Sequence, residues 1–236
     1  MVTLKNLTAG YENAPIIQNI NMDIKEGEIV GLLGHNGSGK TTLALTLLGF
    51  TKIFSGKAEI DGIDVKKEKR EIRKLVSMLM QVPDNQLFAR TIYEELAIAP
   101  YKRGLSQTEI EDIVNTIATQ IGMKDKLHHS VHKLSFGQKK KVAMGVLLSI
   151  DPKYYILDEP MAGLDFEGRS FMEKTIKELK ERGKGILLIS HDVLSLTLCH
   201  KIYIMKNGKV VEVVDGKNIK DIIPDLPQWG LYMPTL

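Results

Sequence analysis

"EIVGLLGHNGSGKTTLALTLLGF", residues 28–50, decides the fold, because an apolar segment passes through a glycine-rich turn into a helical pattern. Within it, "GHNGSGKT" (34–41) fits the phosphate-loop pattern G-x-x-x-x-G-K-[ST]. Glycines in such a loop let backbone N–H groups point inward at a phosphate, where a Cβ would obstruct them. The stretch therefore predicts a strand, a phosphate-binding loop and a helix in direct succession.

The residues of this loop predict contacts with a nucleotide. Lys40 is expected to reach the β- and γ-phosphates, and Thr41 to offer its hydroxyl to Mg²⁺. A glycine-rich turn with an incidental lysine is the alternative, and the complete spacing between a strand and a helix argues against it. The predicted nucleotide-binding residues here are Gly34, His35, Asn36, Gly37, Ser38, Gly39, Lys40, Thr41 and Thr42.

The segments around the loop alternate between strand and helix patterns, which predicts a parallel α/β sheet. Short strands within residues 1–30 precede the loop, and hairpins turn on Asp-Gly and Asn-Gly dipeptides. The predicted segments are strands at 28–34, 74–81, 153–160 and 185–190, helices at 40–50 and 166–183, and hairpins at 56–65 and 201–214. The fold class is thus α/β, with a P-loop core, a mixed or parallel sheet and an N-terminal antiparallel β subdomain.

A helical block, residues 85–145 approximately, interrupts the alternation and predicts an inserted subdomain within a domain spanning 1–220. Its helical stretch at 92–128 is expected to break at Pro100 and Gly104. It resumes after a capping box made by Ser106 and Glu109. The remaining residues, 221–236, are a short tail rich in proline; their composition fits either a poorly structured end or a docking strap.

Composition limits the kinds of partner. Acidic residues (29) nearly match basic ones (32), and the net charge of +3 gives no basic stripe for nucleic acid. A single cysteine, Cys199, excludes an internal disulfide. The chain begins with no signal-peptide pattern and holds no run of about 18 apolar residues. We therefore expect a cytoplasmic protein whose membrane role, if any, comes through a partner.

Polar residues at the ends of three predicted strands are candidates for catalysis. Asp158 and Glu159 end the strand of "YYILDEP" (154–160). Asp158 suits a Mg²⁺ partner of Thr41, and Glu159 can polarise an attacking water. On its own such a pair could equally cap the next helix; the phosphate loop favours catalysis. His191 and Gln81 also follow strands, and their position alone predicts little.

A second glycine-containing turn, "LSFGQ" (134–138), opens another predicted helix. Together with the phosphate loop, Gln81, "ILDEP", "AGLD" (162–165) and His191, it resembles the ATP-binding cassette (ABC) ATPase family over nearly the whole chain. The resemblance implies ATP and Mg²⁺ as cofactors, with Glu159, His191 and Gln81 catalytic. The metal ligands that it implies are Thr41, Gln81 and Asp158.

In that family two nucleotide domains pair head to tail, and each signature turn closes on the nucleotide held by the other domain. The resemblance therefore implies that Ser135, Gly137 and Gln138 face a partner's ATP, and that Asp165 couples the two sites. A Ser-capped surface helix with a lysine face is the simpler alternative for this turn. The resemblance implies that Tyr11 stacks on adenine, whereas its residue type alone favours a turn residue packed on the sheet.

One residue departs from the family pattern. Phe136 stands where the signature usually has a second glycine, which adds bulk and removes backbone freedom beside a ligand. Because Ser135, Gly137 and Gln138 are retained, we expect the site to be kept with altered geometry or turnover.

The segment "QVPDNQLFARTIYEELAIAP" (81–100) resembles the energy-coupling factor branch, which serves vitamin and cobalt or nickel uptake. The resemblance implies a second ATPase subunit, identical or different, a transmembrane scaffold subunit and a substrate-binding membrane subunit. It also implies a peripheral location at the cytoplasmic face of the membrane. Leu87, Phe88 and Ala89 are candidate anchors for a scaffold helix; packing inside the helical subdomain is the alternative.

Two other functions are alternatives to transport. A soluble ABC ATPase acting on nucleic acid or the ribosome would need a long coiled coil, a second cassette or a basic stripe, and the sequence has none of these. A non-hydrolysing regulatory cassette is disfavoured because Glu159 and His191 are both present. The transported substrate cannot be read from an ATPase sequence.

Overall fold

The computed structural model describes residues 1–231, which fold as two compact units. The first unit contains residues 1–78, 153–159 and those from 178 onward; the second contains 79–152 and 160–177. The strands are β1 (Val2–Tyr11), β2 (Ala14–Ile24), β3 (Ile29–Gly34), β4 (Lys52–Ile60), β5 (Ile63–Asp64), β6 (Val76–Leu79), β7 (Tyr154–Asp158), β8 (Gly185–Ser190), β9 (Lys201–Lys206) and β10 (Lys209–Asp215). The α-helices are α1 (Lys40–Leu47), α2 (Lys69–Leu75), α3 (Ile92–Lys102), α4 (Gln107–Gln120), α5 (Phe136–Ile150) and α6 (Phe166–Glu181).

Two sheets form, as expected for the predicted fold class. One has the order β2-β1-β4-β5, and its pairs are antiparallel. The other has the order β10-β9-β3-β8-β7-β6. In it β3 pairs in parallel with both β8 and β9, β7 pairs in parallel with β8, and β10 is antiparallel to β9. The second sheet is therefore mixed, because the Asn-Gly hairpin adds one antiparallel edge strand to a parallel core.

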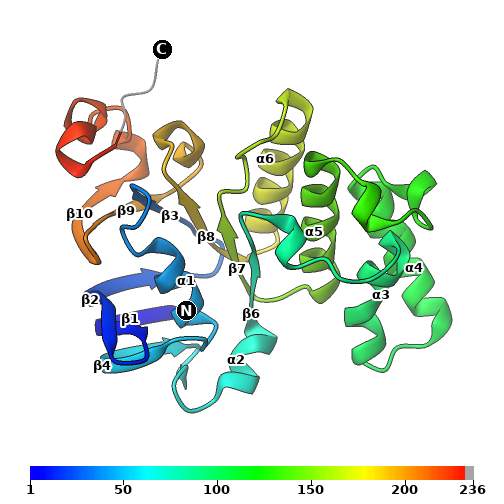
Figure 1. The fold of residues 1–236 in the computed structure, drawn as a ribbon, viewed down its shortest axis with the longest axis horizontal. Helices are drawn as coiled ribbons and strands as arrows, with labels where there is room; N and C mark the ends of the chain where they lie inside the picture. Colours follow the sequence, from blue (N-terminus) through cyan, green and yellow to red (C-terminus); the bar gives the residue numbers. More distant parts are fainter. Residues whose placement is uncertain (232–236) are drawn as a thin grey trace. The chain divides into compact units, whose positions relative to one another are not determined.

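Helix α1 lies between the two sheets of the first unit (Figure 1). Its buried residues Leu43, Ala44 and Leu47 share one apolar core with strands of both sheets. The strand β3 is buried at every position, as its uninterrupted apolar sequence predicts. Because the phosphate loop joins β3 to α1, this core fixes both ends of the loop.

Both predicted hairpins turn on the expected dipeptides. Asp61 and Gly62 have φ values of 51° and 79°, and Asn207 and Gly208 have 49° and 75°. Positive φ at both central residues fits a two-residue turn whose twist matches that of the flanking strands. Asp and Asn tolerate this conformation better than most residues with a side chain, which explains their use here.

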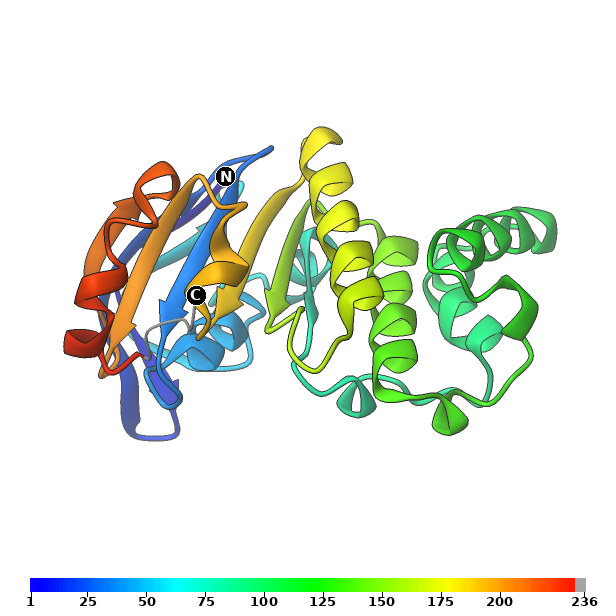
Figure 2. The same cartoon turned by 90° about the horizontal axis from the view of Figure 1, so that it is seen from above.

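The second unit is mainly helical, with α3 packed on α4 and α5 (Figure 2). The predicted capping box of Ser106 and Glu109 opens α4. The predicted break at Pro100 is wrong: Pro100 lies inside α3, which continues to Lys102 and is followed by Gly104 with φ 76°. Proline in the last turn disturbs only the end of the hydrogen-bond ladder, so the helix tolerates it.

The C-terminal tail is ordered as far as the structure describes it, whereas its sequence left this open. Residues Ile223–Trp229 form a 3₁₀ helix, and Leu226, Trp229 and Leu231 are buried. Lys206 Nζ donates to the Gln228 carbonyl at 2.6 Å, which ties this segment to β9. The last residues of the predicted tail, 232–236, lie outside the described residues.

An ionic cluster at the β4–β5 turn makes a pH-dependent contribution to stability. Asp61 accepts hydrogen bonds from Tyr154 Oη at 2.8 Å and from Lys153 Nζ at 2.7 Å. Burial alone would raise the pKa of Asp61, but its hydrogen bonds from Lys153, the amino terminus and Tyr154 outweigh burial and hold that pKa at about 2, below the ordinary 3.8. The stabilisation is therefore complete above the ordinary pKa and is lost as pH falls through the lower value.

We predict that Asp61→Asn lowers the urea midpoint near neutral pH, because it removes this charge. Asparagine keeps the left-handed turn, so the loss reports the ion pair rather than the backbone. The difference from wild type should shrink as pH falls from 3.8 toward about 2. Urea unfolding at several pH values measures it; a difference independent of pH would contradict the assignment.

Candidate nucleotide-binding and hydrolysis site

Parallel pairing of the central strands brings two of the three predicted catalytic residues, Glu159 and His191, to one edge of the sheet. Leu33 of β3 pairs with Ser190 of β8, and Asp158 of β7 pairs with Ile189 of β8. The three strands therefore end almost level with one another. Because each chain segment leaves the sheet there, the phosphate loop, Glu159 and His191 follow from neighbouring strand ends.

Lys40 lies folded back over the phosphate loop. Its Nζ donates to the carbonyl of Gly34 at 2.6 Å and to that of His35 at 3.0 Å. The side chain is 7% exposed. Burial lowers the pKa of Lys40 below its ordinary value, while the charges of Glu159 and Asp158 oppose that shift. Because the Lys40 ammonium is held only by neutral backbone carbonyls of its own loop in these two bonds, a negatively charged phosphate can compete for it.

The glycines of the loop adopt conformations that suit a phosphate cradle. Gly37 and Gly39 have φ values of 81° and 105°. A Cβ on Gly39 would lie 2.8 Å from Ile17 Cγ2, whereas one on Gly37 would meet no heavy atom within 4 Å. Ser38 is fully buried, and within residues 1–231 its hydroxyl has no hydrogen-bond partner. An unsatisfied buried hydroxyl in the loop is a polar group that a ligand can satisfy.

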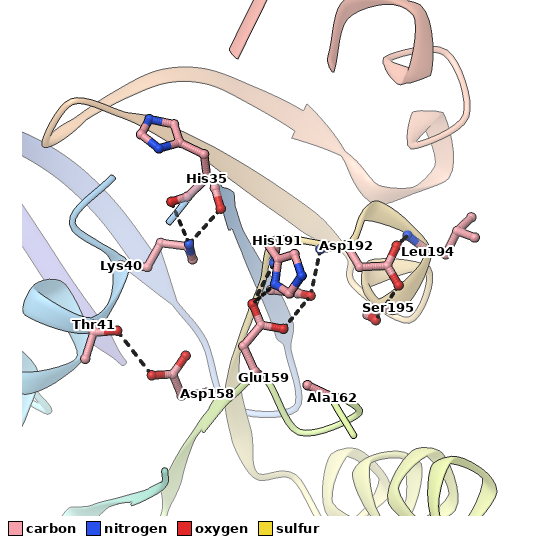
Figure 3. A network of polar contacts seen from close by, with 12 residues as sticks. His35, Lys40, Thr41, Asp158, Glu159, Ala162, His191, Asp192, Leu194 and Ser195 are labelled. Carbon is pink, nitrogen blue, oxygen red and sulfur yellow. Dashed lines mark hydrogen bonds and ion pairs between the residues drawn. The ribbon is translucent and has the colours of Figure 1, made fainter. Parts of the chain in front are cut away.

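Thr41 and Asp158 meet at the start of α1 (Figure 3). Thr41 Oγ1 donates to Asp158 Oδ2 at 3.3 Å. Thr41 is exposed, whereas Asp158 is buried at the end of β7. The pair thus presents a hydroxyl and a carboxylate oxygen side by side, which are the ligand types that Mg²⁺ prefers.

Glu159 points away from Asp158 and is held by the end of β8 (Figure 3). Its Oε1 accepts from the His191 amide at 2.8 Å and lies 2.6 Å from His191 Nδ1; its Oε2 accepts from Ser190 Oγ at 3.1 Å. With Glu159 ionised, Nδ1 must carry the shared proton. Glu159 has a φ of 49°, a left-handed conformation that is costly for a residue with a side chain.

Asn36 is exposed and Thr42 is buried, both in the first unit. Outside the phosphate loop, the remaining predicted residues lie in the second unit, apart from Tyr11. Ser135 caps α5: its hydroxyl accepts from the Gln138 amide at 3.3 Å, and Gln138 Oε1 accepts from the Ser135 amide at 3.1 Å. Asp165 Oδ1 accepts from the Gly168 amide at 2.8 Å at the start of α6. Gln81 is exposed and follows β6 by two residues. The Ser-capped helix expected as an alternative is thus present, and it places Gly137 in the first turn of α5.

Tyr11 ends β1 and is 44% exposed. It lines an open pocket of the first unit together with Phe50 and the lysines Lys52 and Lys69. Its exposed part leaves room for contact with a planar group, and the adenine contact stays a prediction.

The sequence does not predict three features of the structure. Ser190 is the one polar residue of "GILLIS", but nothing in the sequence indicates its bond to Glu159. Gly230 of the C-terminal segment lies against the phosphate loop, since a Cβ there would be 3.5 Å from His35 Cδ2. Lys140 is fully buried, although three consecutive lysines predict a solvated face. Neither of the last two had a local signal.

A strand, phosphate loop and helix, with strand-end carboxylates beside them, define a nucleotide-binding protein of the P-loop class. Comparison with known families gives the finer assignment: residues 17–162 match the family model described as ABC transporter. The chain therefore belongs to the ABC transporter family.

Individual relatives agree with this assignment. The chain is 38% identical over 220 residues to the energy-coupling factor transporter ATP-binding protein EcfA of Methanosphaera stadtmanae, covering 92% of this chain and 77% of that one. The solved structure of cbiO1 from Clostridium perfringens, part of the ABC transporter complex cbiONQ, superimposes with a TM-score of 0.84 at 32% identity, covering 96% and 94% of the two chains. A dimeric ATP-binding cassette in a post-hydrolysis state, bound to ADP and Pi, gives a TM-score of 0.83 at 27% identity, covering 91% and 98%.

The predicted family, its energy-coupling factor branch and the ATPase activity are thus confirmed. The chain is an ATP-binding and ATP-hydrolysing subunit of an ABC transporter of the energy-coupling factor type. Among residues 1–231, no helix has both the length and the apolar character to cross a membrane.

We predict that Lys40→Met abolishes ATP binding while changing the free energy of unfolding by less than about 1 kcal/mol. The variant loses two hydrogen bonds but also removes a buried charge, and the two effects offset each other. Nucleotide titration and urea unfolding measure the two outcomes. Lys5→Met, which alters an exposed lysine of β1, is the control and should keep ATP binding.

Proposed function

We propose that the edge formed by β3, β7 and β8 is the hydrolysis site, and that its ATP turnover drives a transporter assembled with membrane subunits. The contact of Glu159 with His191 is the observation that carries this proposal, because it holds a carboxylate at a strand end beside the phosphate loop. Glu159 is 6% exposed, and its left-handed backbone is a strain that packing alone does not call for.

Each residue of the site has a distinct role in this proposal. Lys40 releases the carbonyls of its own loop and binds the β- and γ-phosphates, while the amides around Gly37 and Gly39 surround the β-phosphate. Glu159 orients and polarises the attacking water. His191 is held by Glu159 through Nδ1, which leaves Nε2 on the exposed side of the ring to meet the γ-phosphate. Tyr11 offers its exposed ring to the adenine.

The hydroxyl and carboxylate oxygens beside the phosphate loop are suitable ligands for a Mg²⁺ ion that arrives with ATP. Thr41 Oγ1 and Asp158 Oδ2 would hold it, both from the first unit. The metal role that the resemblance implies for Gln81 stays a prediction. Within residues 1–231 no group of three His, Cys, Asp or Glu side chains can hold a metal by itself, so phosphates and water would complete the shell, as is usual for Mg²⁺. When bound, the ion would neutralise the charge that develops on the β- and γ-phosphates.

The signature turn has no role in binding the chain's own ATP in this proposal. Ser135, Gly137 and Gln138 at the start of α5, and Asp165 at the start of α6, would act on the ATP of a second cassette paired head to tail. A dimeric relative bound to ADP and Pi supports such pairing. The second cassette can be another copy of this chain or a different one.

The second unit presents a candidate docking surface for a transmembrane scaffold subunit. Phe88 is 73% exposed, and the amides of Phe88 and Ala89 donate to Glu95 Oε1. Glu95 is itself buried on α3, so it holds this loop with the Phe88 ring outward. Leu87 is buried, which agrees with the alternative that these residues pack inside the helical subdomain. Phe88 is therefore the proposed anchor; cbiO1, described as part of the complex cbiONQ, supports membrane partners for this chain.

The vitamin or metal substrate of the transporter, and a place at the cytoplasmic membrane face, stay predictions.

We predict that Glu159→Gln lowers ATP hydrolysis by about 100-fold or more, because an amide cannot accept the proton of the attacking water. ATP binding should persist, and the ATP-bound dimer should accumulate. Phosphate release and sedimentation with Mg-ATP measure the two effects. Glu181→Gln at the exposed end of α6 is the control. Full turnover in Glu159→Gln, or a monomer with Mg-ATP even beside a partner cassette, would refute the proposal.

We predict that Phe88→Ala prevents co-purification of membrane subunits with the tagged chain from gently solubilised native membranes. The physical reason is the loss of the exposed apolar ring that is the proposed anchor. Tyr101→Ala removes another exposed aromatic ring of the same unit, 75% exposed, and should retain the partners. Equal recovery with both variants would place the docking surface elsewhere.

A further inference from the structure

We propose that Phe136 and Lys140 form a clamp that fixes the signature turn to the loop 161–165. Phe136 is the residue that departs from the usual signature pattern, and Lys140 lies one turn later on α5. The clamp would make two segments that face a second cassette move as one. This positioning role rests on the proposed head-to-tail pairing, whereas the clamp itself lies within one unit of the chain.

Lys140 is the fixed point of the clamp. It is 0% exposed, and its Nζ donates to the carbonyl of Ala162 at 2.9 Å. A charged group removed from water is tolerated only where hydrogen bonds and other partners hold it. Moving the ammonium away from the Ala162 carbonyl would therefore cost free energy, so this bond connects α5 to the loop.

Phe136 closes the clamp from the solvent side. Lys140 Nζ lies 5.3 Å from the centroid of the Phe136 ring, within the range of a cation–π contact. The same ring touches the loop: a Cβ on Gly163 would lie 2.8 Å from Phe136 Cε1. Gly163 has a φ of 73° and no side chain, so the loop can run directly beneath the ring.

Neighbouring contacts extend the same connection to Asp165. A Cβ on Gly137 would lie 3.6 Å from Leu164 Cδ2, an ordinary packing distance. Lys141 Nζ lies 2.9 Å from Glu167 Oε1. The first turn of α5 thus contacts the loop and the start of α6 at successive residues, and Asp165 sits between them. The Phe136 ring fills space that a glycine would leave empty, and there it contacts the loop at Gly163.

The first test measures the clamp in the full-length single chain. We expect Phe136→Ala to speed hydrogen exchange at the amides of residues 162–165 by about fivefold or more, the change that a cation–π contact supports. Exchange in α4 should not change. Phe136→Tyr, which keeps a ring, should match wild type. Phe136 is 40% exposed, so its replacement does not threaten folding. Unchanged exchange in Phe136→Ala would overturn the clamp.

A second variant pair tests whether the ring and the loop touch. Gly163→Ala places a methyl group against the Phe136 ring and should speed exchange in the loop by itself. In the Phe136→Ala background that clash is absent, so adding Gly163→Ala should have a smaller effect than in wild type. Purely additive effects would mean that the contact between ring and loop does not hold the loop.

The functional test uses Glu159→Gln as the parent, since hydrolysis is blocked there. Adding Phe136→Ala should raise the protein concentration for half-dimerisation with Mg-ATP by about tenfold, while ATP affinity stays within about twofold. Adding Phe136→Tyr in place of Phe136→Ala should leave dimerisation at the level of the parent. A general loss of structure from any change at this position would instead weaken dimerisation in both variants. If the protein with both Glu159→Gln and Phe136→Ala dimerises as readily as its Glu159→Gln parent, the positioning role alone is overturned. A parent that never dimerises would overturn the proposed pairing and the role that depends on it, while the exchange result still decides whether the clamp exists.

Discussion

The register between β3, β8 and β7 is the constraint on which the first unit depends. Leu33 is paired with Ser190, and Asp158 with Ile189, so three chain segments leave the sheet at one level. A shift by one residue would move one strand end along the sheet by about 3.3 Å and separate the polar groups that follow the strands. The apolar sequences of these strands, buried on both faces, therefore set the geometry of the polar site that follows them.

Several polar groups of the site are held in positions that cost stability. Lys40 is a nearly buried cation, Ser38 has a buried hydroxyl, and Glu159 has a left-handed backbone. Replacing a buried charge or an unsatisfied buried polar group by an apolar side chain is often neutral or stabilising in other proteins. Their presence together at one sheet edge agrees with a site selected for binding and turnover rather than for stability.

The sequence predicts most of the first unit because its signals are local. A continuous apolar strand, a loop with fixed glycine spacing and the Asp-Gly and Asn-Gly turns each define their conformation within a few residues. The burial of Lys140 has no such signal, because it depends on the carbonyl of Ala162, far along the chain. Pro100 shows the opposite limit: a strong local breaker was overridden by its place in the last turn of α3. The contact of Gly230 with His35 likewise joins opposite ends of the chain.

The left-handed backbone at Glu159 restricts how this position can change during evolution. Glycine, asparagine and aspartate accept a φ of 49° at little cost, whereas valine and isoleucine do not, because their branched Cβ crowds the backbone. A lineage that lost hydrolysis would therefore accept glycine, asparagine or aspartate first at this position. Inactive descendants of such a cassette should be recognisable by that bias, while their sheet and phosphate loop remain intact.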